Sequence, residues 1–158
     1  MTHLKKLLTR PLVNISIGLA VVALIVAVLG FADATYLTIE HYRGIVPPCS
    51  ITGGCEEVLT SEFSTIVGIP TSLLGIIYYL LICVGVFLYL DTKKAVILKI
   101  TLMLPWFGLG FSLWFTYLQI IVIRSYCAYC LVSAVITATL FFISFIMFKR
   151  SHSFHENI

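Results

Sequence analysis

The chain has 158 residues, of which 60% are hydrophobic and 11% charged, and its mean hydropathy is +1.08. Because soluble domains carry about 25% charged residues, this composition excludes an ordinary soluble protein and indicates one embedded in a membrane. The net charge of +3 requires no nucleic-acid partner, since a cytoplasmic excess of cations in a membrane protein explains it.

Four apolar stretches each reach the roughly 20 residues that a helix needs to cross a bilayer. Since lipid offers no hydrogen-bond partners to a backbone, each stretch is expected to be helical. The sequence therefore predicts an all-α membrane protein, a four-helix bundle with a long exoplasmic loop between its first two helices. The expected single domain covers residues 1–158, with spans at about 12–35, 65–90, 98–123 and 126–148.

The lysines and arginines predict the orientation of these spans. Eight of the ten lie on one side, before the first span, between the second and third, and after the fourth; Arg43 and Arg124 lie on the other. By the positive-inside rule, both termini are expected in the cytoplasm and the long loop outside the inner (cytoplasmic) membrane. A cleaved signal peptide is the alternative for the first stretch, but its 21 uncharged residues exceed the usual 7–15.

The first span reaches an acidic residue, Asp33, near its expected exoplasmic end. A carboxyl at that depth is typical of a proton relay, but it also suits a residue at the wet interface. Both interpretations stay open.

The long loop, from about His41 to Ser64, holds two cysteines. Two prolines directly precede Cys49, and Gly53 and Gly54 directly precede Cys55. Prolines favour an extended approach, and glycines allow the tight backbone that a small disulfide loop requires. On the exoplasmic side such a disulfide would form and persist.

The second predicted span contains a fifth cysteine, Cys83, which is expected to be a small buried hydrophobic residue. The last span opens with the motif Cys127-Ala-Tyr-Cys130, whose two cysteines share one helix face. Free amides and the helix dipole favour a thiolate at a helix start, while apolar burial opposes it.

Three interpretations of the clustered cysteines are compatible with their positions. An inert structural disulfide is one, and a zinc site is another, although the spacing of Cys49 and Cys55 is too wide for a typical zinc half-site. No metal is therefore predicted. The third interpretation is a thiol–disulfide electron relay. It is favoured because the motif cysteines, Cys127 and Cys130, and the loop cysteines, Cys49 and Cys55, are expected on the same exoplasmic face.

The order of several motifs resembles the vitamin K epoxide reductase (VKOR) family in its prokaryotic form. The resemblance runs from about Gly18 to Ile146 and implies a quinone, ubiquinone or menaquinone, held among the four helices beside the CxxC motif. The matching residues are Asp33-Ala-Thr-Tyr-Leu-Thr, Cys49, Gly54-Cys55, Val58, Ser61, Gly68-Ile-Pro70, Gly75, Tyr78-Tyr79 and Cys127-x-x-Cys130.

The resemblance implies a role for each of the four clustered cysteines. Cys130 would meet the quinone, with Cys127 as its partner. Cys55 would exchange with Cys127, and Cys49 would take electrons from an external dithiol protein.

The resemblance also suggests polar residues near the quinone. Ser61 matches a hydroxyl that could stabilise a thiolate or a quinone oxygen. Thr71 lies where vertebrate members carry a quinone-binding asparagine, although a threonine near a helix start often serves in capping or packing. Asp33 and Thr71 are the expected quinone-binding residues.

The predicted function is that of a quinone-dependent protein-thiol oxidase that supports disulfide formation. Its expected partner is a separate thioredoxin-like or DsbA-like exoplasmic protein, because no fused thioredoxin-like domain is expected. A DsbB-type oxidase would place its two cysteine motifs in the reverse order. The alternatives are a vitamin K epoxide or quinone reductase, disfavoured because Ala134 replaces a vertebrate tyrosine, and a non-catalytic membrane protein stapled by disulfides.

Overall fold

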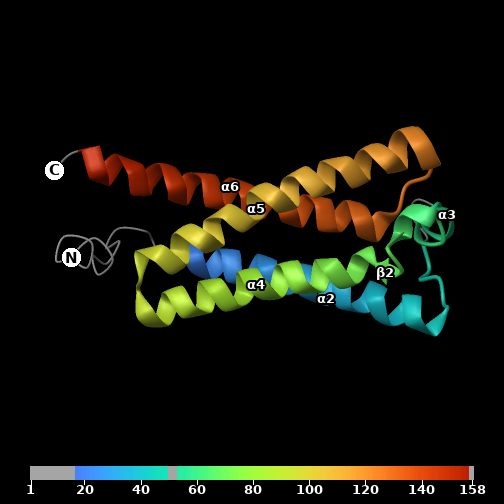
Figure 1. Ribbon diagram of the computed structural model, residues 1–158, viewed down its shortest axis with the longest axis horizontal. Coiled ribbons are helices and arrows are strands. Elements are labelled where there is room, and N and C mark those ends of the chain that lie inside the picture. Colours follow the sequence, from blue (N-terminus) through green and yellow to red (C-terminus); the bar gives the residue numbers. More distant parts are fainter. Residues whose placement is uncertain (1–16, 50–52, 157–158) are drawn as a thin grey trace.

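The computed structural model describes residues 17–49 and 53–156 and shows a bundle of four long helices (Figure 1). Each of the four is long and apolar enough to cross a membrane, so the predicted all-α, four-span membrane protein is confirmed. The third span, α5, continues without a break into one π-helical segment. The elements are α2 (Ile17–Arg43), α4 (Thr71–Thr92), α5 (Ala95–Tyr117), the π segment η2 (Leu118–Ile123) and α6 (Ala128–Glu156).

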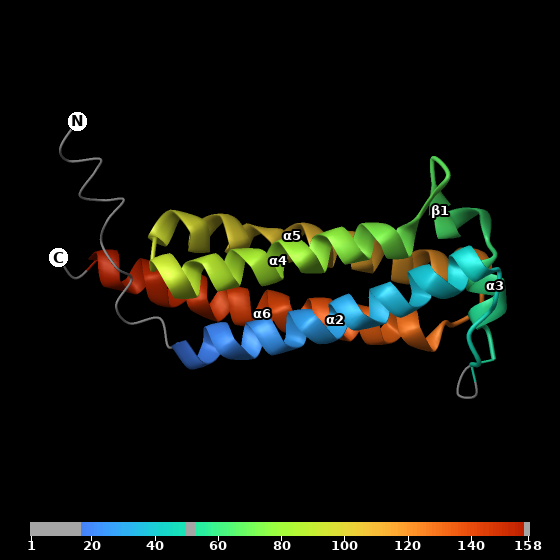
Figure 2. The ribbon, with the colours of Figure 1, turned by 90° about the horizontal axis from the view of Figure 1, so that it is seen from below.

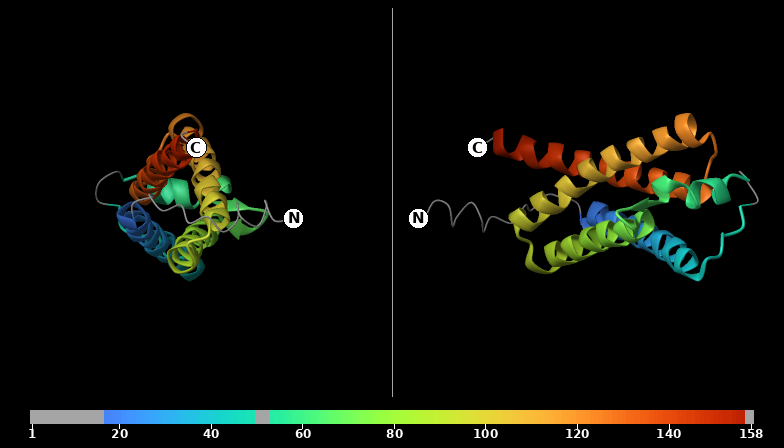
Figure 3. Two further views of the ribbon diagram at one scale, coloured as in Figure 1. Left: turned by 90° about the vertical axis from the view of Figure 1, so that its left-hand side faces the viewer. Right: turned by 45° about the vertical axis from the view of Figure 1, so that its right-hand side comes forward.

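The four helices form a closed ring in cross-section, in the order α2, α4, α5, α6 and back to α2 (Figure 3). The start of α2, the α4–α5 turn and the end of α6 lie at one end of the bundle (Figure 2). The short helix α3 (Cys55–Leu59), the 3-10 turn η1 (Glu62–Ser64) and a small hairpin lie at the other end. Large apolar side chains such as Phe87 and Phe107 point outward, as expected of surfaces that face lipid.

Glycines let the helices of the ring approach closely. Gly30 of α2 faces the ring of Tyr79, and Gly108 of α5 faces the ring of Tyr78, so a side chain at either glycine would collide with an aromatic ring. The Tyr79 hydroxyl lies 2.8 Å from the Ser133 hydroxyl and 3.0 Å from that of Thr137. These polar contacts join α4 to α6 inside a mainly apolar core.

Three helix bounds differ by six or more residues from the predicted spans. Helix α6 continues to Glu156 instead of ending near residue 148. Helix α2 continues to Arg43 instead of ending near residue 35, because Leu37 on its inner face is still buried in the bundle. Residues 65–70 form a hairpin of β1 (Thr65–Ile66) and β2 (Ile69–Pro70) instead of the first turn of a span. Val67 and Gly68 both adopt positive φ in its turn, at 53° and 79°. Residues 12–16 of the first predicted span lie outside the described residues.

Candidate active site

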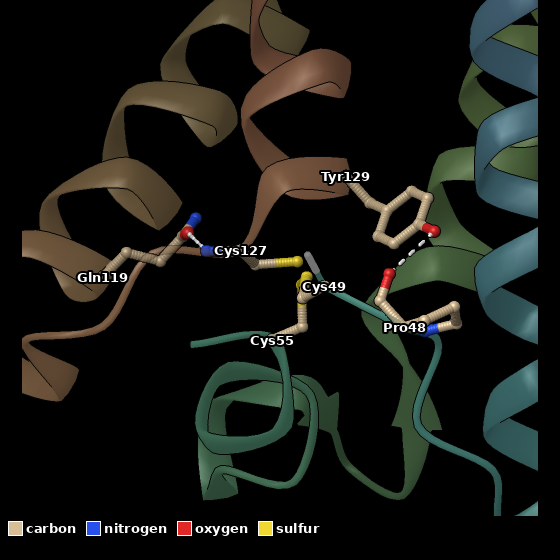
Figure 4. The surroundings of a disulfide bond; sticks show 6 residues. All are labelled: Pro48, Cys49, Cys55, Gln119, Cys127 and Tyr129. Atoms are coloured by element: carbon tan, nitrogen blue, oxygen red, sulfur yellow. Dashed lines mark hydrogen bonds between the residues drawn. A yellow bond between two sulfur atoms is a disulfide. The ribbon is translucent and has the colours of Figure 1, made fainter. Parts of the chain in front are cut away.

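A disulfide joins Cys49 to Cys55 at the end of the bundle that carries α3 (Figure 4). Their Cα atoms lie 5.9 Å apart, within the usual range for a disulfide. Gly53 adopts a φ of 67°, and its N–H donates to the carbonyl of Cys49 at 3.3 Å. A non-glycine residue would be strained there, so Gly53 provides the tight backbone that the sequence predicted for this loop.

The CxxC motif lies directly against this disulfide. Cys127 precedes α6, Cys130 lies in its first turn, and both are free thiols. Cys55 and Cys127 are each 0% exposed and share one buried cluster, with Cys49 and Cys130 packed at its edge. In Figure 4 the Cys127 side chain points toward the disulfide sulfurs. The fold therefore brings together the two pairs that the sequence separates by more than 70 residues.

Gln119 fixes the turn that carries Cys127 (Figure 4). Its side-chain carbonyl accepts the Cys127 N–H at 3.1 Å, and its main-chain carbonyl accepts the Ser125 N–H at 3.2 Å. It is 1% exposed and lies in the π segment, a type of helix that often marks functional sites. The sequence analysis missed this residue, although a lone glutamine inside an apolar span was a usable signal.

Helix α3 is held against the link between η2 and α6. A Cβ atom on Gly54 would lie 2.9 Å from the backbone nitrogen of Tyr126, so only glycine allows this approach. The Ser125 hydroxyl donates to the Glu57 carboxylate. These contacts hold the loop disulfide beside the CxxC motif.

A cavity of about 720 Å³ opens beside Cys130. Its volume is within the range of small-molecule sites, and aromatic side chains such as Phe111 and Phe115 line much of it. Asp33, Ser61 and Thr71 also line it, together with Ala134 and Cys130, whereas Cys127 does not. Cys130 therefore lies at the cavity wall, and Cys127 lies with the loop disulfide.

Two of the predicted hydroxyl groups already donate to backbone carbonyls. The Ser61 hydroxyl donates to Val58 at 2.7 Å, and the Thr71 hydroxyl donates to Ser64 at 3.1 Å. Both can still accept a hydrogen bond from the cavity. Their roles toward a thiolate or a quinone stay predictions.

The fifth cysteine lies away from this site. Cys83 packs half-buried against the helix core and does not line the large cavity. Among the described residues, no group of three or more histidines, cysteines or acids is arranged to hold a metal ion.

The electrostatics distinguish Cys127 from an ordinary thiol. A hydrogen bond from the Cys130 thiol lowers the pKa of Cys127 below its usual value, although burial opposes this shift. A lower pKa increases the thiolate fraction at neutral pH, and the thiolate is the nucleophile in disulfide exchange.

Four spans, two cysteine pairs in one buried cluster and an adjoining cavity are the features of a membrane-embedded oxidoreductase. The chain belongs to the vitamin K epoxide reductase family, whose family model matches residues 21–145. Proteins of this family are membrane oxidoreductases related to disulfide formation, and they use quinones. A search of curated proteins found no match to this sequence.

Proposed function

We propose that this protein is a quinone-dependent protein-thiol oxidase that supports disulfide formation. The observation that carries the proposal is the division of the CxxC motif between two environments. Cys127 is buried with the loop disulfide, while Cys130 lines the cavity. Electrons entering at the loop would therefore leave at the cavity.

The loop pair begins the relay. A thiolate of the partner attacks the sulfur of Cys49, the Cys49–Cys55 bond breaks, and Cys55 leaves as a thiolate. The second thiolate of the partner then attacks its own sulfur in the mixed disulfide, which releases Cys49 and leaves the partner oxidised by two electrons.

The CxxC pair receives these electrons in its oxidised form. Cys55 attacks Cys127, the Cys127–Cys130 bond breaks, and Cys130 leaves as a thiolate. Cys49 then attacks Cys55, which restores the loop disulfide and releases Cys127.

The residues around the cavity fit a quinone. The cavity is large enough for an aromatic head group, its walls are mainly apolar, and two residues with unpaired buried polar atoms, Asp33 and Tyr78, line it. A bound quinone would accept two electrons and two protons, for which Cys130 is the nearest redox group and Asp33 a candidate proton donor. Asp33 and Thr71 are the proposed contacts carried from the sequence.

The same proposal places the protein in the inner membrane, with both termini in the cytoplasm and the four clustered cysteines outside. The partner would then be a separate thioredoxin-like or DsbA-like protein. Epoxide reduction is the alternative, and Ala134 in the cavity wall provides no tyrosine hydroxyl for it.

An anaerobic assay tests the proposed oxidase. Purified protein is mixed with a reduced thioredoxin-like protein and ubiquinone-1 or a short-chain menaquinone, and quinone absorbance is followed. Wild type should reduce the quinone in proportion to partner oxidised. Cys55→Ala should lose oxidation of the protein partner, while a small dithiol still reduces the quinone through Cys127 and Cys130.

Cys83→Ala is the matched control and should behave as wild type, because Cys83 lies outside the site. Absence of quinone reduction by wild type with either reductant would exclude the proposed function. Partner oxidation by Cys55→Ala at the wild-type rate would exclude the loop relay.

A further inference from the structure

Two buried side-chain atoms have no hydrogen-bond partner within the described part of the chain, and both belong to residues of the large cavity. They are Oδ2 of Asp33 on α2 and the hydroxyl oxygen of Tyr78 on α4. Buried polar atoms in folded proteins are almost always paired. Because both residues line one cavity, a ligand bound there is the candidate for the missing partners.

Two of the other hydroxyls around the cavity are already engaged. The Tyr79 hydroxyl contacts Ser133 and Thr137, and the Thr71 hydroxyl donates to a backbone carbonyl. The Tyr78 hydroxyl makes no such hydrogen bond, so it can donate to a ligand without breaking one.

The ring of Tyr78 is held in place by its neighbours. It packs against Gly108 of α5, where any side chain would collide with its hydroxyl end. It also contacts the ring of Tyr79 edge to face, with centroids 4.9 Å apart. Because the ring is confined on two sides, its hydroxyl is a preorganised donor.

The chemistry of the two groups defines the ligand class. A phenol donates one hydrogen bond, and a carboxyl group in its acid form also donates one. Their natural complement is a molecule with two acceptor oxygens and no donor on an otherwise apolar body. A quinone head group has this pattern, with two carbonyl oxygens on one ring.

We propose that the Tyr78 hydroxyl and the Asp33 carboxyl bind the carbonyl oxygens of the quinone head group. The inference rests on the proposed function and names the two residues that position the quinone beside Cys130. Asp33 was expected from the sequence as a quinone contact, whereas Tyr78 comes from the structure.

Equilibrium binding of ubiquinone-1 to the full-length oxidised protein in nanodiscs tests this assignment by calorimetry. Tyr78→Phe removes one oxygen atom and should weaken binding about tenfold, the effect of one well-placed hydrogen bond. Tyr89→Phe removes a hydroxyl from the same helix outside this cavity and should leave the Kd unchanged. Asp33→Leu should weaken binding, and Asp33→Asn, which keeps an N–H donor, should largely restore it.

A second ligand separates hydrogen bonding from general damage to the cavity. A ring of the same size and tail that lacks both carbonyl oxygens should bind wild type and Tyr78→Phe equally. Equal Kd values for ubiquinone-1 in wild type and Tyr78→Phe would overturn the role of Tyr78. Failure of wild type to bind either ubiquinone-1 or a short-chain menaquinone would instead overturn the proposed function itself.

Discussion

At the scale of single residues, the two cysteines of the CxxC motif differ although only two residues separate them. Cys127 lies before the first turn of α6 and is buried with Cys55. Cys130 lies inside that turn and lines the cavity. The attack from the loop should therefore fall on Cys127, and Cys130 should be the sulfur that leaves as a thiolate at the cavity wall.

Removing both thiolates that can displace the Cys55–Cys127 bond should trap the exchange. Cys130→Ser in a Cys49→Ala background leaves neither Cys130 nor Cys49 to attack that bond, so a stable Cys55–Cys127 disulfide should accumulate after mild oxidation with diamide. Mass spectrometry of non-reduced peptides measures it. Cys127→Ser is the matched variant and should not trap Cys55. Comparable trapping of Cys55 by Cys130 in that variant would mean that the roles are reversed.

The hydrogen bond between the thiols of Cys127 and Cys130 predicts how the reactivity of Cys127 depends on pH. Since the Cys130 thiol lowers the pKa of Cys127, Cys127 should form its thiolate at a lower pH than an ordinary cysteine. In Cys130→Ala that bond is lost and burial remains, so the midpoint of Cys127 alkylation should move to higher pH. The rate of iodoacetamide labelling at Cys127 in reduced protein, read by peptide mass spectrometry, measures both midpoints. A midpoint that is unchanged or lower in Cys130→Ala would contradict the prediction.

At the scale of elements, the π segment η2 determines where Cys127 lies. Its hydrogen bonds run from residue i to i+5, which makes its turn wider than that of an α-helix. Gln119 lies in this segment, and Arg124 ends it with a φ of 57°. One glutamine thereby accepts hydrogen bonds from both Ser125 and Cys127. A substitution of Gln119 should therefore disturb both the end of η2 and the position of Cys127.

Gln119→Leu tests the role of this segment. The change leaves the buried Cys127 N–H without its acceptor, which should cost about 1–3 kcal/mol of stability. Thermal unfolding in detergent should show a lower Tm, and formation of the Cys55–Cys127 bond in a background with Cys49→Ala and Cys130→Ser should slow. Gln119→Glu keeps an acceptor oxygen and should partly restore the exchange rate. Ile121→Leu, an exposed change in the same segment, should alter neither quantity. Unchanged exchange in Gln119→Leu would show that the amide does not position Cys127.

The helices and their local geometry could be predicted from the sequence, whereas the contacts between helices could not. Long uncharged stretches predicted the four spans because membrane insertion depends on local composition. The spacing of Cys127 and Cys130, and the glycines beside Cys55, predicted local geometry for the same reason. The orphaned Tyr78 hydroxyl and the two hydrogen bonds of Gln119 depend on which helices become neighbours. No local pattern encodes that arrangement, so the roles of both residues could be inferred only from the fold.

At the scale of the whole molecule, the lysines of the α4–α5 turn lie at one end of the bundle and the four clustered cysteines lie at the other. Lys93 and Lys94 lie at the α4–α5 turn, which shares its end with the start of α2. Arg43 ends α2 at the opposite end, and Arg124 precedes the CxxC motif there. The cation-rich turn and the four clustered cysteines therefore lie at opposite ends of the bundle, and by the positive-inside rule we propose that the cysteines face the exoplasm.

Single-cysteine labelling checks this orientation. In a background with all five native cysteines replaced, Glu56→Cys places a thiol on exposed α3, and Asp91→Cys places one near the exposed α4–α5 turn. A membrane-impermeant maleimide should label Glu56→Cys on intact bacterial spheroplasts and should label Asp91→Cys only after permeabilisation. The reverse pattern would put the cysteines in a reducing compartment, where the loop disulfide would not persist. Orientation therefore decides whether an exoplasmic dithiol protein can be the electron donor.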